Sequence, residues 1–233
     1  MWYHTLTNRR LRQLLLLSLP LLVALGSSPA RAMEFALAAG DGGRRIVVAR
    51  GLIQAGDAER LRAALQMADR DAFGLRTIAF DSPGGAVDEA FAMTGVMDRE
   101  KVAAVVRKGA SCASACAQIV FLAATHRTVD DGGRLGLHSC SRAGDGTRAQ
   151  LCNEIIAQQA SARGAPYGTI MAFMQLTPPG QIRWLDAEDS DCWGLTLWPP
   201  GSGRGIQAGD APPCILHGPR PRNPSGSRSA SAR

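Results

Sequence analysis

The sequence predicts an α/β fold in which helices cover a mainly parallel sheet within a single domain. Three observations lead to this prediction. Short apolar and β-branched runs alternate with segments of helical periodicity, hydrophobic residues make up 45% of the 233-residue chain, and charged residues make up 20%. Such a chain can bury a sizeable core. Strands that alternate with helices usually pair in parallel, because each helix returns the chain across the sheet.

Three strands and two helices are expected in the first half of the domain. Ile46–Ala49, Leu75–Phe80 and Val102–Val106 are short apolar or β-branched runs typical of strands. Asp57 is suited to cap the first helix. Apolar residues recur at spacings of three and four in both helices. The predicted buried faces are Leu61, Ala64, Leu65 and Ala68 in the first helix, and Val87, Ala90, Phe91, Thr94 and Met97 in the second.

The second half continues the alternation. Residues 113–124 are apolar on all sides, which favours a buried helix. Leu135–His138 is a predicted strand, helices are expected at 148–162 and 166–175, and Leu195–Trp198 is the last predicted strand. The face expected to be buried in the helix at 148–162 is Cys152, Ile155, Ile156 and Gln159.

Both ends of the chain differ from this middle part. Three arginines precede an apolar run of about 13 residues, which is too short to span a bilayer, and Ala30-Arg31-Ala32 matches a small-x-small cleavage pattern. Residues 1–32 are therefore a predicted signal peptide for export to the periplasm, cleaved after Ala32, with a retained membrane anchor as the alternative. Of the last 35 residues, 23 are Pro, Gly, Ser or Arg, so 199–233 is a predicted disordered tail. The folded domain is then 33–198.

The charge distribution excludes one class of partner. The formal net charge of +6 comes from the two ends, because residues 33–198 contain 17 basic and 19 acidic residues. The folded part therefore lacks the basic surface that nucleic-acid binding requires, and no nucleic-acid partner is expected.

All six cysteines follow residue 32, and an even number in an exported protein indicates disulfides. Six cysteines allow 15 pairings, which the sequence leaves open. Cys140 and Cys152 bracket a Gly-rich polar loop, and Cys192 and Cys214 are placed to tie the tail to the domain. No spacing of Cys and His matches a zinc site, so neither a metal nor another cofactor is expected.

The residues suited to catalysis lie between 81 and 138. Ser114, with alanine on either side, comes where a loop enters the predicted buried helix, so its hydroxyl would lie near free backbone N–H groups. His138 ends a predicted strand 24 residues later and is suited to act as general base. Gly84-Gly85 closes another strand and can aim a backbone N–H into the same cleft. Separately, each has an ordinary explanation: a helix cap, a structural histidine and a turn.

The order and spacing of these residues resemble the Clp protease/crotonase superfamily, and within it the ClpP-like serine peptidases. In that family a strand ends in Ser-Pro-Gly-Gly, the nucleophilic serine follows about thirty residues later, and the histidine some twenty-five residues after that. Ser82-Pro83-Gly84-Gly85, Ser114 and His138 match this pattern. The resemblance covers roughly residues 44–198 and implies a ClpP/crotonase-like spiral of βαβ units.

The resemblance also implies roles for individual residues. Ser114 would attack the substrate carbonyl, His138 would accept its proton, and the backbone N–H groups of Gly85 and Ala115 would form the oxyanion hole. The family's catalytic aspartate falls near Thr177-Pro178, where this chain has no carboxylate. The nearest candidates for a third member, Asp186 and Asp189, require a shift of register.

Further departures concern the surroundings of the site. Cys112 and Cys116 straddle Ser114, where a disulfide would either rigidify the loop or block the cleft. Ser141–Arg148, at the position of the segment that helps stack two rings in ClpP, is a polar loop, so the tetradecameric barrel is not expected. A smaller homo-oligomer is still possible. Both lysines precede Ser114, which argues against a Ser–Lys pair.

The sequence thus predicts a periplasmic serine hydrolase, of peptidase type, that acts on peptides or proteins with a Ser–His pair. No Clp ATPase partner is expected, because the periplasm lacks ATP. The alternative is a catalytically inactive binding or assembly module of the same fold. Acyl-CoA chemistry of the crotonase type is disfavoured, because exported proteins do not meet CoA.

Overall fold

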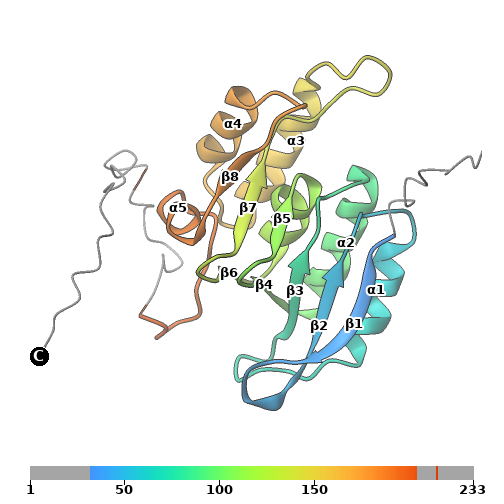
Figure 1. Cartoon of the computed structure of the whole chain (residues 1–233), viewed down its shortest axis with the longest axis vertical. Coiled ribbons are helices and arrows are strands. Elements are labelled where there is room, and N and C mark those ends of the chain that lie inside the picture. The colour runs from blue at the N-terminus through green and yellow to red at the C-terminus, as the bar shows by residue number, and fades with distance from the viewer. Residues whose placement is uncertain (1–31, 204–213, 215–233) are drawn as a thin grey trace, which may run out of the picture.

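The computed structural model describes residues 32–203 and Cys214, which are drawn in colour in Figure 1. These residues form one α/β domain with two sheets, and most of the strand pairings are parallel. The predicted single α/β domain with a mainly parallel sheet is therefore confirmed. The signal-peptide prediction for residues 1–32 lies outside the described residues except for Ala32, and most of the predicted tail at 199–233 also lies outside them.

Within the described residues, eight strands form the two sheets. The larger sheet has the order β1-β2-β3-β4-β6, in which β1 is antiparallel to β2 and the others are parallel. The smaller sheet has the order β5-β7-β8, in which β5 and β7 are parallel and β8 is antiparallel. The strands are β1 Glu34–Ala39, β2 Arg45–Arg50, β3 Arg76–Asp81, β4 Val102–Val106, β5 Ser111–Ala113, β6 His126–Val129, β7 Arg134–Leu137 and β8 Arg183–Leu185.

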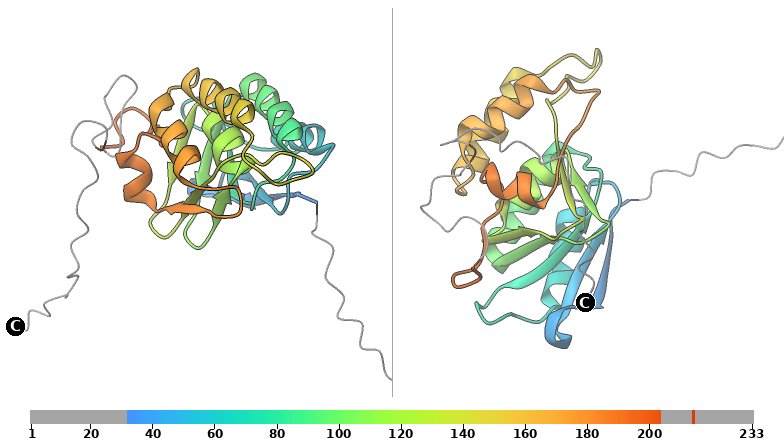
Figure 2. Two further views of the ribbon diagram at one scale, coloured as in Figure 1. Left: turned by 90° about the horizontal axis from the view of Figure 1, so that it is seen from above. Right: turned by 60° about the vertical axis from the view of Figure 1, so that its left-hand side comes forward.

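Helices α1, α2 and α3 lie in a row along one side of the strands (Figure 2). Helix α1 packs on α2, α2 on the π-helical turn η2, and η2 on α3. The predicted apolar faces of the first two helices are buried at Leu61, Leu65, Ala90 and Met97, whereas Val87, also predicted on the buried face of the second helix, is exposed. The helical elements are η1 Asp41–Gly43, α1 Asp57–Gln66, α2 Val87–Glu100, η2 Cys116–Val120, η3 Phe121–Ala123, α3 Gln150–Ser161, α4 Tyr167–Leu176 and α5 Ala187–Cys192.

Successive βα units cross the larger sheet in chain order, from β2 to β3, β4 and β6. The two sheets meet just after β3, where Ser82 forms a parallel bridge with Cys112 of β5. The Ser82 N–H donates to the Ser111 carbonyl at 2.7 Å, and the Ala113 N–H donates to the Ser82 carbonyl at 2.9 Å. The turn that follows β3 therefore lies directly beside the segment that leads to Ser114.

Two predicted helix starts are wrong. Asp57 is the first residue of α1, because Gly56, at a φ of 87°, takes the capping position. The Asp57 carboxylate instead accepts a hydrogen bond from the Gln54 N–H at 2.6 Å. The apolar stretch at 113–124 is buried as predicted, but its helical part begins only at Cys116, since Ala113 ends strand β5.

Two predictions for the C-terminal half are also wrong. Ile155 of α3 is 44% exposed, because the buried face of this helix contains the polar Asn153 together with Ile156, Ala157 and Ala160. Leu195–Trp198 is not a strand. Only Leu197 pairs, with Arg127, because Thr196 and Trp198 both bond through their side chains to the Asp191 carboxylate.

Arg127 of β6 is fully buried and connects the larger sheet to the C-terminal part of the domain. Its guanidinium donates to the carbonyl of Leu195 at 2.8 Å and to that of Arg163 at 3.0 Å. No carboxylate among the described residues forms an ion pair with it, and burial lowers the pKa of Arg127 to about 10. The guanidinium is therefore held by carbonyl dipoles alone.

We expect Arg127→Ala to lower the free energy of unfolding by about 3–5 kcal/mol, because buried carbonyls lose their donor and a cavity is left. Urea denaturation measures this loss. The matched control is Arg62→Ala, which removes an exposed ion pair with Glu59. This control is expected to change stability by no more than about 0.5 kcal/mol. Similar losses in the two variants would contradict the structural role of Arg127.

Candidate active site

Ser114 is held in a strained backbone conformation between β5 and η2. Its φ is 55°, and among the described residues only one other non-glycine residue, Lys101, has a positive φ. This region costs an L-residue roughly 1–2 kcal/mol and is found mostly at functional sites. The Ser114 N–H donates to the Gly136 carbonyl at 2.9 Å, and its carbonyl accepts from the Gln118 N–H at 2.9 Å. These two hydrogen bonds keep the residue in its strained position.

The ordinary explanation of Ser114 as a helix cap does not hold in this structure. The capping position of η2 belongs to Ala115, and no side chain forms a capping hydrogen bond there. The Ser114 hydroxyl is therefore not committed to the helix end.

The Ser-Pro-Gly-Gly turn requires its glycines. Gly84 and Gly85 have φ values of 97° and 148°. A Cβ on Gly84 would lie 2.7 Å from the Ser114 Cβ and 2.9 Å from the Ala115 nitrogen, and one on Gly85 would lie 2.2 Å from the Ile53 carbonyl oxygen. Only glycine allows this turn to pack against both segments. The turn thus brings a bare backbone against Ser114.

The two residues predicted to supply oxyanion donors, Gly85 and Ala115, both line the cavity described below. In the parallel bridge between Ile53 and Gly85, Ile53 bonds to the Gly84 carbonyl at 2.8 Å and to the Ala86 N–H at 3.0 Å. The N–H of Gly85 consequently faces away from Ile53. The N–H of Ala115 precedes the first helical turn, where N–H groups lack an intrahelical partner. Such donors suit a developing negative charge on oxygen.

His138 follows β7 immediately and reaches the same edge of the smaller sheet as Ser114. Strands β5 and β7 are parallel, with Ala113 opposite Gly136, so the residues that follow both strands lie at one edge. Gly136 permits this close approach, because a Cβ there would lie 2.9 Å from the Ala113 Cβ. Ser114 and His138 are not hydrogen-bonded to each other in this structure, as is common for catalytic pairs without substrate.

All four residues predicted as nucleophile, base and oxyanion donors line one cavity of about 130 Å³: Gly85, Ser114, Ala115 and His138. Its remaining walls are mostly apolar and include the Cys140–Cys152 disulfide. They are formed by Val87, Gln118, Cys140, Ser141, Cys152 and Ile156. A larger cavity of about 390 Å³ lies on the larger sheet, but none of the predicted site residues line it.

No carboxylate among the described residues hydrogen-bonds to the imidazole of His138. Burial lowers the pKa of His138, and the nearby backbone of Ser139 and Pro179 acts in the opposite direction. Its Nδ1 is buried and has no hydrogen-bond partner of good geometry among the described residues. The Thr177 carbonyl accepts from the Ser139 N–H at 2.9 Å, so the Thr177-Pro178 segment, which has no carboxylate, lies next to the residue that follows His138.

The titration of His138 predicts a pH profile for the reactivity of Ser114. A general base must be neutral, and burial favours the neutral imidazole. We expect the rate at which a fluorophosphonate probe labels Ser114 to rise with pH to a plateau, with a midpoint below the ordinary histidine pKa of 6.5. Labelling rates measured between about pH 4 and pH 9 test this, and a midpoint above 7 would contradict it.

Asp186 and Asp189, the two candidates for a third catalytic residue, are not brought to the cavity. Asp186 caps helix α5, where its carboxylate accepts from the Asp189 N–H at 2.9 Å. Neither residue lines the cavity. The cavity is therefore lined by Ser114, His138, Gly85 and Ala115, and no carboxylate among the described residues lines it.

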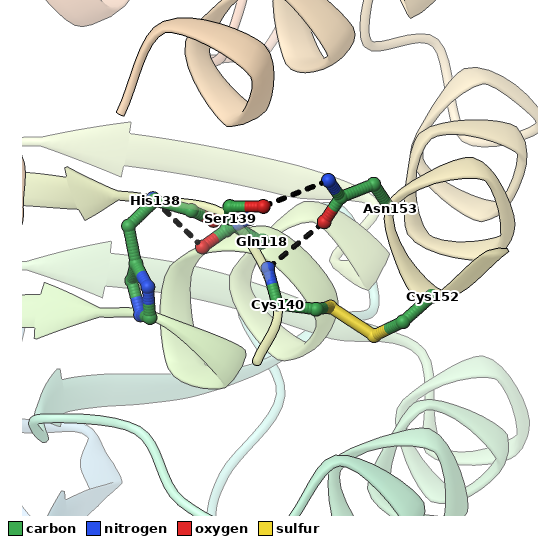
Figure 3. Close-up of a disulfide and its surroundings, with 6 residues drawn as sticks. All are labelled: Gln118, His138, Ser139, Cys140, Cys152 and Asn153. Carbon is green, nitrogen blue, oxygen red and sulfur yellow. Dashed lines mark hydrogen bonds between the residues drawn. A yellow bond between two sulfur atoms is a disulfide. The ribbon is translucent and has the colours of Figure 1, made fainter. Parts of the chain in front are cut away.

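The described residues contain three disulfides, Cys112–Cys116, Cys140–Cys152 and Cys192–Cys214, and each of these pairings was among those considered from the sequence. The Cys112–Cys116 bridge spans Ser114, but both cysteines are buried and neither lines the cavity, so it closes the loop without blocking the site. The bridge at the cavity wall is Cys140–Cys152, and Cys140 lies two residues after His138 in the chain (Figure 3).

Sequence reasoning missed two buried carboxamides beside His138. Gln118 hydrogen-bonds to the backbone of His138, and Asn153 of α3 bonds to Ser139 and Cys140 (Figure 3). The available signal was polarity, since Gln118 is a polar residue in an otherwise apolar stretch. The contact itself joins residues 20 positions apart, which periodicity does not reveal.

Two kinds of feature are absent from the described residues. Residues 32–203 contain no helix that is both long and apolar enough to cross a bilayer. No cluster of three or more His, Cys, Asp or Glu side chains suited to a metal ion occurs in the same part of the chain.

Comparisons with known proteins give similarity of structure but not of sequence. No family model and no curated protein sequence matches the chain. Among solved structures, it is similar to a point mutant of ClpP1 from Listeria monocytogenes, with 19% identity and a TM-score of 0.49 over 64% of this chain and 86% of that one. It is also similar to the ClpP protease catalytic domain from Plasmodium falciparum, with 15% identity and a TM-score of 0.47 over 62% of this chain and 78% of that one.

Proposed function

We propose that the protein is a serine hydrolase of peptidase type that works outside the cytoplasm and without ATP. The observation that carries the proposal is the convergence of Gly85, Ser114, Ala115 and His138, from three separate segments, on one cavity. The positive φ of Ser114 supports it, because strain of this kind persists where function requires it.

The proposed reaction is acyl transfer through a covalent intermediate. The Ser114 Oγ attacks the carbonyl carbon of the scissile bond while His138 accepts its proton. The oxygen that becomes negative is bound by the N–H groups of Gly85 and Ala115. His138 then gives the proton to the leaving amine, and water releases the acyl group from Ser114 by the same route in reverse.

A periplasmic location is part of the proposal. The three disulfides support it, because disulfides persist in oxidising compartments. Expected substrates are peptides or misfolded exported protein chains. A homo-oligomer stays a prediction, which light scattering of the purified protein would test.

One observation favours a second function, that of a catalytically inactive binding or assembly module. The buried Nδ1 of His138 lacks the carboxylate that orients the base in a triad. Loss of that acid costs about 10⁴-fold where a triad depends on it. In this second function, the cavity would hold a peptide without cleaving it.

Labelling of the purified protein with a fluorophosphonate probe distinguishes the two functions. A hydrolase is expected to form a covalent adduct, and mass spectrometry of a digest should place it on the peptide containing Ser114. His138→Ala is expected to slow the labelling strongly, because it removes the base. Absence of any adduct between about pH 5 and 9 would overturn the hydrolase and leave the binding module.

A further inference from the structure

A Ser–His pair without an acid must obtain the placement of its histidine from somewhere else in the protein. The Nδ1 of the His138 imidazole has no hydrogen-bond partner of good geometry among the described residues, although the backbone of Ser139 and Pro179 lies near the ring. Its position therefore depends on how firmly the backbone of His138 is held. Strand β7 ends one residue earlier, at Leu137, so strand pairing does not extend to His138.

The side chain of Gln118 takes the place of a strand partner. Its amide nitrogen donates to the His138 carbonyl at 2.9 Å, and its carbonyl oxygen accepts from the His138 backbone N–H at 3.2 Å (Figure 3). This reciprocal pair satisfies both backbone groups of His138. Gln118 is only 3% exposed, so water does not compete for these hydrogen bonds.

Gln118 is also connected directly to the nucleophile. Its backbone N–H donates to the Ser114 carbonyl at 2.9 Å, across the turn that enters η2. Turns of π-helix, such as η2, are frequent at functional sites. The path from Ser114 to the backbone of His138 therefore passes through a single residue, with a hydrogen bond at each end.

The neighbouring residues are held from the other side by α3. Asn153 accepts from the Cys140 N–H at 2.8 Å and donates to the Ser139 hydroxyl at 2.9 Å. The Cys140–Cys152 disulfide anchors the same segment to the same helix (Figure 3). These contacts fix the residues after His138, whereas only Gln118 among the described side chains hydrogen-bonds to the backbone of His138 itself.

We propose that Gln118 is the positioning residue of the Ser–His pair, and that its carboxamide holds the backbone of His138 at the distance from Ser114 that proton transfer requires. This inference rests on the proposed function in taking His138 as the base. In a catalytic triad the acid orients the histidine; here, this part of the acid's role falls to Gln118. Gln118 acts through His138 and takes no proton itself.

The test replaces Gln118 with methionine, which has a similar shape and no amide. The rate of fluorophosphonate labelling is expected to fall about 100-fold, because moving the base by about 1 Å reduces reactivity by that much. A second measurement follows the His138 imidazole by NMR titration, with the resonance assigned through a His138→Gln variant. Because the released ring gains exposure, the pKa of His138 is expected to rise toward 6.5.

Two controls separate positioning from general destabilisation. Leu65→Ala removes a fully buried side chain of α1, which lines no part of the cavity, and should lower the melting temperature without moving the His138 titration. His126 serves as an internal reference, since burial also lowers its pKa and it lies on the larger sheet. Its titration should be the same in wild type and in Gln118→Met.

The His138 titration decides the inference. An unchanged titration in Gln118→Met overturns it, and a rise that is absent from Leu65→Ala supports it. If the wild type does not label at all, the proposed hydrolase fails, but the titration still shows whether Gln118 positions His138. If Gln118→Met does not fold, Gln118→Asn is judged by the same titration, because it keeps the amide one methylene short of His138.

Discussion

Replacing Ser114 by alanine is expected to abolish fluorophosphonate labelling and peptide hydrolysis while leaving the melting temperature within about 2 °C of wild type. The loss follows because Ser114 supplies the attacking oxygen. Stability is retained because the hydroxyl does not cap η2. Labelling and differential scanning fluorimetry on the same preparations measure both effects. A helix cap would behave differently, since its removal costs about 1 kcal/mol.

Ser114→Gly is the matched variant that tests the backbone strain. Glycine adopts a φ of 55° without the penalty of a Cβ, so this variant is expected to gain about 1 kcal/mol over Ser114→Ala. Both variants lack the nucleophile, so both should be inactive. Equal stability of the two variants would show that the conformation at Ser114 carries no strain and would remove one support of the proposed function.

Replacing Gly84 by alanine is expected to slow labelling of Ser114 by about 10²-fold or more, the effect of losing one oxyanion donor. The added Cβ would lie 2.7 Å from the Ser114 Cβ and 2.9 Å from the Ala115 nitrogen, so both the nucleophile and a proposed donor must move. The variant should also lose about 2–4 kcal/mol of stability, from the positive φ and from the overlap. Labelling kinetics and urea denaturation measure the two effects.

Gly109→Ala is the control for the backbone conformation alone. Gly109 also has a positive φ, of 80°, but a Cβ there would have no atom within 4 Å. It should lose only about 1 kcal/mol and label at the wild-type rate. If both variants labelled like wild type, the close packing of the Ser-Pro-Gly-Gly turn on Ser114 would have no bearing on reactivity.

The sequence by itself determined the fold class and the parts of the site that depend on short segments. Runs such as Val102–Val106 became strands at or within one residue of the predicted bounds, because their apolar character is local and strong. Ser114, His138 and Gly85, which line one cavity, were singled out because a turn, a small-residue junction and a strand end each leave a sign in the chain. Their spacing then suggested that they lie together.

Only the tertiary structure decided what surrounds His138. Gln118 and Asn153 are polar residues on buried helix faces, and their bonding partners lie 20 and 13–14 residues away. Periodicity counts such residues as exposed or out of phase, which is why the buried face of α3 was predicted wrongly at Ile155. The positions of Asp186 and Asp189, outside the cavity, likewise depend on how the chain after Thr177 returns to the smaller sheet.

One physical reason explains why the sequence determined some features and only the tertiary structure decided others. Apolar burial and turn conformation depend on a few neighbouring residues, so a single sequence carries them. Hydrogen bonds between buried polar groups depend on the relative placement of distant segments, and that placement is set by packing of the whole domain. The chain therefore specifies a serine, a histidine and a glycine turn in order, whereas the packed domain specifies that a glutamine side chain, and no aspartate among the described residues, hydrogen-bonds to the backbone of His138.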